Sequence, residues 1–225
     1  MGRRALGVSG APPVVGAWGV LGGTFDPIHY AHLAIAESVR ETLSLAGVLF
    51  VPAGLPPHKR DRIVSPAADR VAMVELAIAD NPAFRLSRVE VDRPGRSFAV
   101  DTMEQLRTYP VDEAAASAGY VFIVSSEALA GLPSWHRPER LLELCRIVVV
   151  PRPGHPGLGR SWAAEHFPGR EERIVFLGGP GLGISASHIR ACARDGRSIR
   201  YLVPPAVEQY VQEHRLYQPD VWSKN

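Results

Sequence analysis

Cysteine is scarce in this chain of 225 residues, which contains only Cys145 and Cys192. The two are not spaced as a CxxC pair, so they form neither a disulfide framework nor a zinc site and suit a reducing compartment. The chain also lacks a run of about 18 apolar residues, the length that crosses a bilayer. We therefore expect a cytoplasmic protein without a membrane partner.

An excess of charge of one sign is also missing. The net charge is +2, and no long block of lysine and arginine occurs. The sequence therefore gives no sign of a nucleic-acid polymer as partner, although small basic clusters suffice to hold phosphate groups. The sequence is compatible with a homo-oligomer and does not decide the oligomeric state.

Hydrophobic residues are plentiful and make up 46% of the chain. At this length an α/β chain can bury a sizeable core within one domain. We expect residues 1–15 to form a disordered extension, because they lack the apolar stretch of a secretory signal. Residues 16–215 should form the domain and 216–225 a tail.

Apolar segments of strand length recur along the chain, at 20–21, 48–51, 84–91, 120–124, 147–150 and 174–177. Helical patterns occur between and after them, at about 31–44, 66–80, 97–108, 137–144 and 206–214. This alternation predicts βαβ units, and near-continuous Val, Ile and Leu runs indicate strands covered on both faces. We therefore predict an α/β fold with a doubly wound parallel sheet and a ligand at the carboxyl ends of its strands.

The most informative segment has the sequence LGGTFDPIHYAH and runs from Leu21 to His32. Gly22 and Gly23 follow an apolar strand and let the backbone approach a ligand closely. His29 and His32 are three residues apart, so a helix places both on one face of its first turn. Unpaired backbone N–H groups at such a helix start attract an anion. The pattern predicts a phosphate site.

This segment resembles the HxGH signature of the nucleotidylyltransferase superfamily. A second segment, ISASHIR at 184–190, resembles the ISSTxIR signature of the same proteins. The segments PHK (57–59), VEVDRPGRSFAVDT (89–102) and LPSW (132–135) follow in the order typical of bacterial nicotinate-nucleotide adenylyltransferases. The resemblance covers roughly residues 16–215 and implies a single-domain, Rossmann-like nucleotidylyltransferase fold.

The resemblance implies transfer of the adenylyl group of ATP to nicotinate mononucleotide, which gives deamido-NAD and pyrophosphate in NAD biosynthesis. The partners are then two small molecules, ATP with its bound Mg²⁺ and a pyridine mononucleotide. Alignment of the phosphates and neutralisation of the developing charge can supply most of the catalysis. We therefore expect neither a nucleophilic side chain nor metal ligands from the protein.

Roles for individual residues follow from the same resemblance. The expected catalytic residues are His29, His32 and Arg190. The expected contacts to ATP come from Gly22, Gly23, Thr24, Phe25, Ser125, Glu127, Ile184, Ser185 and Ser187, and those to the acceptor from Lys59, Phe98, Ala99 and Trp135. Trp135 would stack on the pyridine ring. Asp26 is expected to make a local turn hydrogen bond rather than to bind metal.

The chain departs from the family pattern at four places. Ala31 replaces the glycine of HxGH, and ISASHIR keeps one hydroxyl of the family's Ser-Thr pair. Ala99 replaces a threonine that contributes to the pocket for the nicotinate carboxylate. Ser125 and Glu127 replace the glycine and aspartate of a Gly-x-Asp-x-Leu segment that contacts nucleotide. A Cβ near the ligand and a longer carboxylate can weaken nucleotide binding by about 1 kcal/mol or more.

Three alternatives are weighed against the leading interpretation. The same chemistry could use another acceptor, nicotinamide mononucleotide or, with less support, phosphopantetheine. A nucleotide-binding homologue with impaired turnover would explain Ser125 and Glu127, but not the intact histidine pair and Arg190. An NAD-dependent dehydrogenase has the least support, because no GxGxxG follows the first strand.

Overall fold

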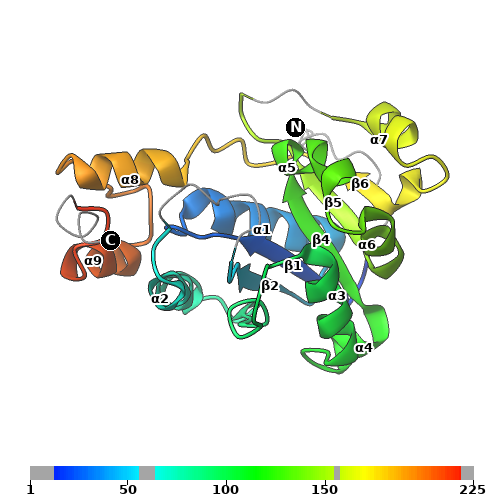
Figure 1. The fold of residues 1–225 in the computed structure, drawn as a ribbon, viewed down its shortest axis with the longest axis horizontal. Coiled ribbons are helices and arrows are strands. Elements are labelled where there is room, and N and C mark those ends of the chain that lie inside the picture. The colour runs from blue at the N-terminus through cyan, green and yellow to red at the C-terminus, as the bar shows by residue number, and fades with distance from the viewer. Residues whose placement is uncertain (1–12, 56–63, 155–157, 219–225) are drawn as a thin grey trace, which may run out of the picture.

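The computed structural model describes residues 13–55, 64–154 and 158–218. Six parallel strands form one sheet in the order β3-β2-β1-β4-β5-β6 (Figure 1). They are β1 (Trp18–Gly23), β2 (Gly47–Pro52), β3 (Phe84–Leu86), β4 (Tyr120–Ser125), β5 (Arg146–Val150) and β6 (Ile174–Phe176). The predicted doubly wound parallel sheet is confirmed, and its strand order reverses between β1 and β4.

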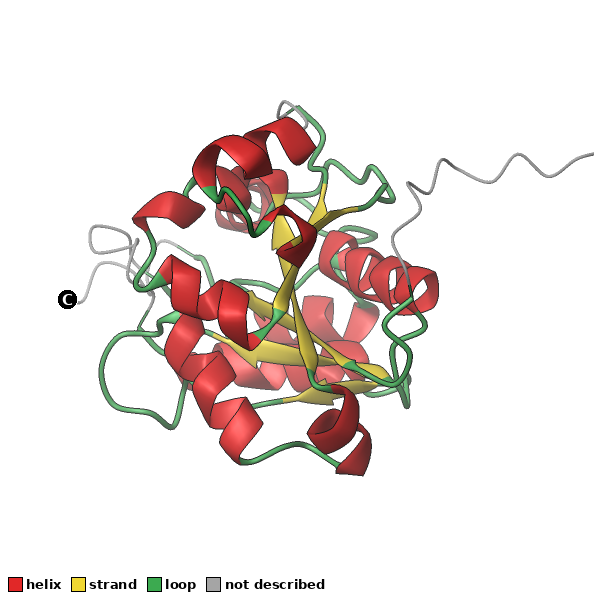
Figure 2. Ribbon diagram, turned by 90° about the vertical axis from the view of Figure 1, so that its right-hand side faces the viewer, coloured by secondary structure: helices red, strands yellow, loops and turns green. Residues whose placement is uncertain are grey.

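Helices cover both faces of the sheet (Figure 2). The first face carries α1 (Tyr30–Leu43), α2 (Ala67–Ile78), α8 (Ala186–Arg194) and α9 (Pro205–Glu213). The second face carries α3 (Ala99–Thr108), α4 (Glu113–Ala118), α5 (Ser126–Ala130), α6 (Pro138–Leu144) and α7 (Arg160–His166). Two 3-10 turns, η1 (Leu132–Ser134) and η2 (Glu171–Arg173), precede α6 and β6.

Alternating residues of each strand contribute side chains to the two hydrophobic cores, one on each face of the sheet. In β1 and β2, Leu21 and Phe50 pack with the helices of the first face, whereas Val20 and Leu49 pack with those of the second. All four side chains are less than a tenth exposed. Burial on both sides explains why these strands are nearly continuous apolar runs.

The main error in the predicted elements concerns the strand at 84–91. β3 ends at Leu86, and the N–H of Ser87 makes the last bond to β2 by donating to the carbonyl of Phe50 (2.9 Å). Beyond this point β2 ends at Pro52, which has no N–H to extend the ladder. The chain turns instead, and Glu90 becomes buried. The five predicted helices agree with the structure to within two residues at each end.

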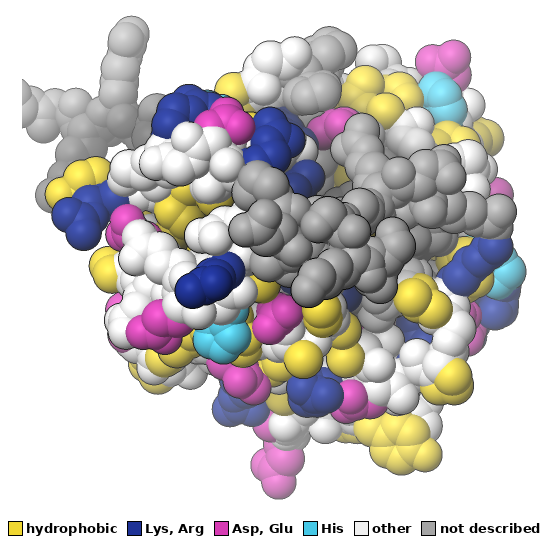
Figure 3. Space-filling view, turned by 60° about the vertical axis from the view of Figure 1, so that its left-hand side comes forward, with side chains coloured by type: hydrophobic (Ala, Val, Ile, Leu, Met, Phe, Trp, Pro, Cys, Tyr) yellow, Lys and Arg dark blue, Asp and Glu magenta, His cyan; other side chains and the backbone are white. Residues whose placement is uncertain are grey.

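Packing extends beyond the predicted limits of the domain. The N–H of Val14 donates to the carbonyl of Leu43 (2.9 Å), which ties the segment before β1 to the end of α1. Leu216 and Tyr217 are buried in the core beneath α9. On the face seen in Figure 3, basic and acidic side chains are interspersed. No helix in the described part of the chain is long and apolar enough to span a membrane.

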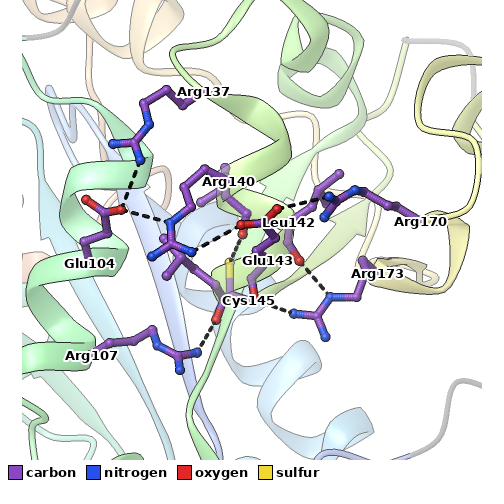
Figure 4. Close-up of polar contacts among 11 residues, drawn as sticks. Glu104, Arg107, Arg137, Arg140, Leu142, Glu143, Cys145, Arg170 and Arg173 are labelled. Atoms are coloured by element: carbon purple, nitrogen blue, oxygen red, sulfur yellow. Dashed lines mark hydrogen bonds and ion pairs between the residues drawn. The ribbon is translucent and has the colours of Figure 1, made fainter.

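Arginine side chains satisfy the carboxyl end of α6 (Figure 4). Arg107 donates to the carbonyl of Leu144 (2.8 Å), and Arg173 donates to the carbonyl of Leu142 (2.7 Å). The last carbonyls of a helix lack partners within the helix, so these bonds replace water. They also fasten α3 and the segment before β6 to α6.

Candidate functional site

A cavity of about 710 Å³ opens at the carboxyl ends of β1, β4 and β5. This is where the strand order reverses, the usual ligand position in a doubly wound sheet. Lys59 lies outside the described residues. The other residues with predicted roles all line the cavity: Gly22, Gly23, Thr24, Phe25, His29, His32, Phe98, Ala99, Ser125, Glu127, Trp135, Ile184, Ser185, Ser187 and Arg190.

The two histidines lie together at the start of α1, as their spacing predicts. His29 is the N-cap residue, and its ring stacks on that of His32 with the centroids 3.7 Å apart. The N–H of His29 donates to Nδ1 of His32 (3.3 Å), so neutral His32 carries its proton on Nε2. Phe25 packs edge-on against His32, with the centroids 5.1 Å apart. These contacts fix the orientation of the His32 ring.

His29 is held as a neutral imidazole. Burial, with a smaller contribution from the positive charge of Arg152, lowers the pKa of His29 from 6.5 to about 4. The His29 side chain and the backbone N–H of His32 form one half of a capping box at the start of α1, and the bond from the N–H of His29 to the His32 ring forms the other.

Arg190 reaches this loop from the second signature segment, on α8. Its guanidinium donates to the main-chain carbonyl of Asp26 (2.7 Å) and to the hydroxyl of Ser187 (3.3 Å). Ser185 caps the helix by accepting the N–H of His188 (3.2 Å). The Ser185 hydroxyl can still donate its own proton to an anion. Two signature segments far apart in the chain thus meet in one cavity.

The predicted local turn hydrogen bond of Asp26 is wrong. The carboxylate accepts the N–H of Ser65 (3.3 Å) and the hydroxyl of Tyr217 (2.8 Å), 39 and 191 positions away. Asp26 is only 2% exposed. A buried carboxylate must find its partners in the interior that surrounds it, and here these come from distant segments. Asp26 is therefore an anchor of the loop rather than a turn former.

Arg70 of α2 is a second anchor, which sequence reasoning missed. Its guanidinium is buried and donates to the carbonyls of Thr24 (2.9 Å), Gly54 (3.3 Å) and Ser65 (3.0 Å). Burial lowers the pKa of Arg70, and the nearby charge of Asp26 opposes this shift. The sequence feature that could have pointed to Arg70 is its position on an otherwise apolar face of α2. Arg70 joins the loop after β1 to the segment after β2.

At the end of β4, Ser125 and Glu127 already have partners within the protein. The Ser125 hydroxyl caps α5 by accepting the N–H of Ala128 (3.1 Å). Glu127 forms an ion pair with Arg152 (2.6 Å), and both side chains are about half exposed. Arg152 follows β5 and also lines the cavity, although the sequence assigned it no role. It adds a cation close to the histidine pair.

The opposite end of the cavity is aromatic. Phe98 and Ala99 lie at the start of α3, and Trp135 follows η1 and packs edge-on against Phe122, with the centroids 6.2 Å apart. The ring of His136, to which the sequence assigned no role, lies against that of Phe98 with the centroids 4.6 Å apart and the planes tilted by 36°. These residues come from the second face of the sheet, whereas α8 with Arg190 lies on the first.

A buried carboxylate completes this aromatic end. Glu90 is 7% exposed and accepts the hydroxyl of Thr102 (2.6 Å). Burial raises its pKa, and hydrogen bonds from Thr102 and Ser97 oppose the rise. A Cβ on Gly54 would lie 2.3 Å from the carbonyl of Glu90, so glycine is required where these segments meet. The sequence analysis gave Glu90 no role because it interpreted residues 84–91 as a strand.

Comparisons with known proteins identify the family of this chain. Residues 20–192 match the cytidylyltransferase-like family. The chain is 45% identical over 200 residues to the "Probable nicotinate-nucleotide adenylyltransferase" of Roseiflexus sp. (strain RS-1), a match that covers 89% of this chain and 97% of the relative. It is 43% identical over 201 residues to the protein of the same name from Thermomicrobium roseum, with 89% and 91% covered.

The fold also matches a solved structure. Plasmodium falciparum nicotinic acid mononucleotide adenylyltransferase complexed with NaAD gives a TM-score of 0.71 at 20% identity, with 89% of this chain and 97% of that chain covered. This likeness shows the shared fold, and the curated relatives show the family. The chain belongs to the nicotinate-nucleotide adenylyltransferases, nucleotidyltransferases of NAD biosynthesis with a Rossmann-like fold.

Proposed function

We propose that this chain transfers the adenylyl group of ATP to nicotinate mononucleotide, forming deamido-NAD and pyrophosphate in the cavity at the ends of β1 and β4. The observation that carries the proposal is the meeting of two anion-binding groups. The stacked pair His29 and His32 lies at the start of α1, and Arg190 bonds to the preceding loop. Arg190 can offset part of the charge of a triphosphate, and the neutral histidines can donate hydrogen bonds to its oxygens.

The reaction needs charge stabilisation rather than a base. An oxygen of the acceptor's phosphate, already an anion, attacks the α-phosphorus of ATP. The bond from that phosphorus to the bridging oxygen breaks, and pyrophosphate leaves with the bond electrons. His29 and His32 would donate to the α-phosphate oxygens, and Arg190 with the hydroxyls of Ser185 and Ser187 would hold the β- and γ-phosphates.

The cavity supports one position for each substrate. Arg190 and Ile184 line it from the α8 side, where the triphosphate would lie with its nucleoside. Phe98 and Trp135 line it from the other face of the sheet, where a pyridine ring would stack. The histidine pair lies at the start of α1 beside the β1 loop. The attacking and leaving groups would therefore lie in line across it.

Magnesium would enter this site with ATP. In the described ranges no three His, Cys, Asp or Glu side chains gather to hold one ion. The carboxylates of Asp26 and Glu127 are engaged by Tyr217 and Arg152. Phosphate oxygens and water, the usual ligands of Mg²⁺ in such reactions, would then hold the ion, and its positive charge would offset part of the charge of the triphosphate.

Pyrophosphate release from Mg-ATP tests the proposal, with nicotinate mononucleotide, nicotinamide mononucleotide and phosphopantetheine offered separately. We expect release with nicotinate mononucleotide and a loss of about a hundredfold in kcat in His32→Ala. His214→Ala is the matched control, because His214 also stacks on an aromatic ring, that of Tyr210 (3.9 Å), but does not line the cavity. Unchanged kcat in His32→Ala would refute the role given to His32, and no release from the wild type with nicotinate mononucleotide would refute the proposed reaction.

A further inference from the structure

We infer that Tyr217 is a positioning residue for the adenylyl transfer and acts on Arg190 through Asp26. Asp26 binds both residues at once. Its main-chain carbonyl accepts a hydrogen bond from the guanidinium of Arg190 (2.7 Å), and its carboxylate accepts one from the hydroxyl of Tyr217 (2.8 Å). The inference rests on the proposed function, because it requires Arg190 to hold the triphosphate.

The contact between Tyr217 and Asp26 is shielded from water, since both residues are only 2% exposed. Burial, together with the negative charge of Asp26, raises the pKa of Tyr217, so its hydroxyl keeps its proton and remains the donor. A hydrogen bond to a charged group is strong in such surroundings, and a buried carboxylate that loses one is destabilised. The Tyr217 hydroxyl therefore restrains Asp26, and with it the carbonyl that Arg190 binds.

The backbone conformation of Tyr217 fits this role. Arg215 (φ 50°) ends α9 in the left-handed conformation usual for a helix cap, and the N–H of Leu216 donates to the carbonyl of Val211 (3.0 Å). Tyr217 is also left-handed (φ 69°), which the cap does not require. A bulky residue rarely adopts this conformation, and it persists only where the surrounding contacts hold it. The buried ring and the bond to Asp26 supply such contacts.

A separate bond limits what the loss of the Tyr217 hydroxyl can disturb. The buried guanidinium of Arg70 donates to the carbonyl of Thr24 (2.9 Å), two positions before Asp26. This bond keeps the start of the loop in place, so the loop should still bind substrate. The guanidinium of Arg190 loses its fixed position beside the leaving pyrophosphate. Misplacement of a charged group near the reacting atoms lowers kcat more than it raises KM.

Steady-state kinetics of Tyr217→Phe with Mg-ATP and nicotinate mononucleotide test the inference. We expect kcat, measured per folded molecule, to fall about tenfold and KM for both substrates to change less than about threefold. Tyr210→Phe is the matched control, because the hydroxyl of Tyr210 also donates to a carboxylate, that of Asp69 (2.9 Å), but Tyr210 does not line the cavity. Both substitutions remove one bond between a tyrosine and an aspartate, and only Tyr217→Phe should lower kcat.

A double-mutant cycle separates positioning from destabilisation. Tyr217→Phe should lower kcat about tenfold in the wild type but less than about twofold in Arg190→Ala, because the guanidinium that it positions is then absent. Equal effects in the two backgrounds, or an unchanged kcat in Tyr217→Phe, overturn the inference. If the wild type releases pyrophosphate with nicotinate mononucleotide, either result leaves the proposed function intact; a wild type without this activity removes both.

Discussion

His29 gives the most quantitative prediction of the structure. Its pKa is about 4 in the folded protein, against about 6.5 for an unperturbed histidine. Between these values the unfolded chain binds a proton that the folded protein does not, so the free energy of unfolding rises with pH. The contribution is complete above about pH 6.5 and lost as the pH falls toward 4. The gap between the two pKa values corresponds to about 3 kcal/mol.

The substitution His29→Asn isolates the pH-dependent contribution of His29 to the free energy of unfolding. The asparagine amide keeps hydrogen-bonding groups but does not titrate between about pH 4 and pH 7. Urea unfolding at several values between about pH 4 and pH 7 gives the free energy of unfolding of both proteins. We expect the stability of the wild type relative to the variant to fall by about 3 kcal/mol on acidification across that range. Parallel curves for the two proteins would refute the reasoning.

Three further predictions concern the interior. Tyr217→Phe removes the donor to the Asp26 carboxylate (2.8 Å) and should lower the free energy of unfolding by about 1–3 kcal/mol, measured by urea unfolding; no change would mean that the bond does not form. Gly47→Ala would place a Cβ 2.5 Å from a backbone oxygen and should lower the melting temperature, whereas Gly183→Ala, with no atom within 4 Å of its Cβ, should leave it nearly unchanged. Burial raises the pKa of Cys145 to about 12, so its thiol should react with a thiol reagent at pH 8 only after unfolding.

Local chemistry explains what the sequence predicted well. The histidine pair depends only on helical spacing, and the sheet depends on apolar runs between helical segments, so both follow from the chain itself. The contacts of Asp26, Arg70 and Tyr217 could not be predicted from the sequence. Their partners are set by packing between distant segments, and the spacing of residues along the chain does not show this. The alternating Val-Glu-Val pattern around Glu90 is typical of a strand. The segment does not form one because the neighbouring strand β2 ends at Pro52 and offers no further backbone partner.

The bond between Asp26 and Tyr217 sets an order for biosynthesis. A chain grows from its amino end at about 5–20 residues per second, so the 191 positions between the two take about 10–40 s to make. For that whole interval the loop after β1 lacks its bond to Tyr217, and the contacts from Ser65 and Arg70 can already hold it. The nascent protein can form most of its sheet before this, but the loop gains its bond to Tyr217 only when that residue leaves the ribosome.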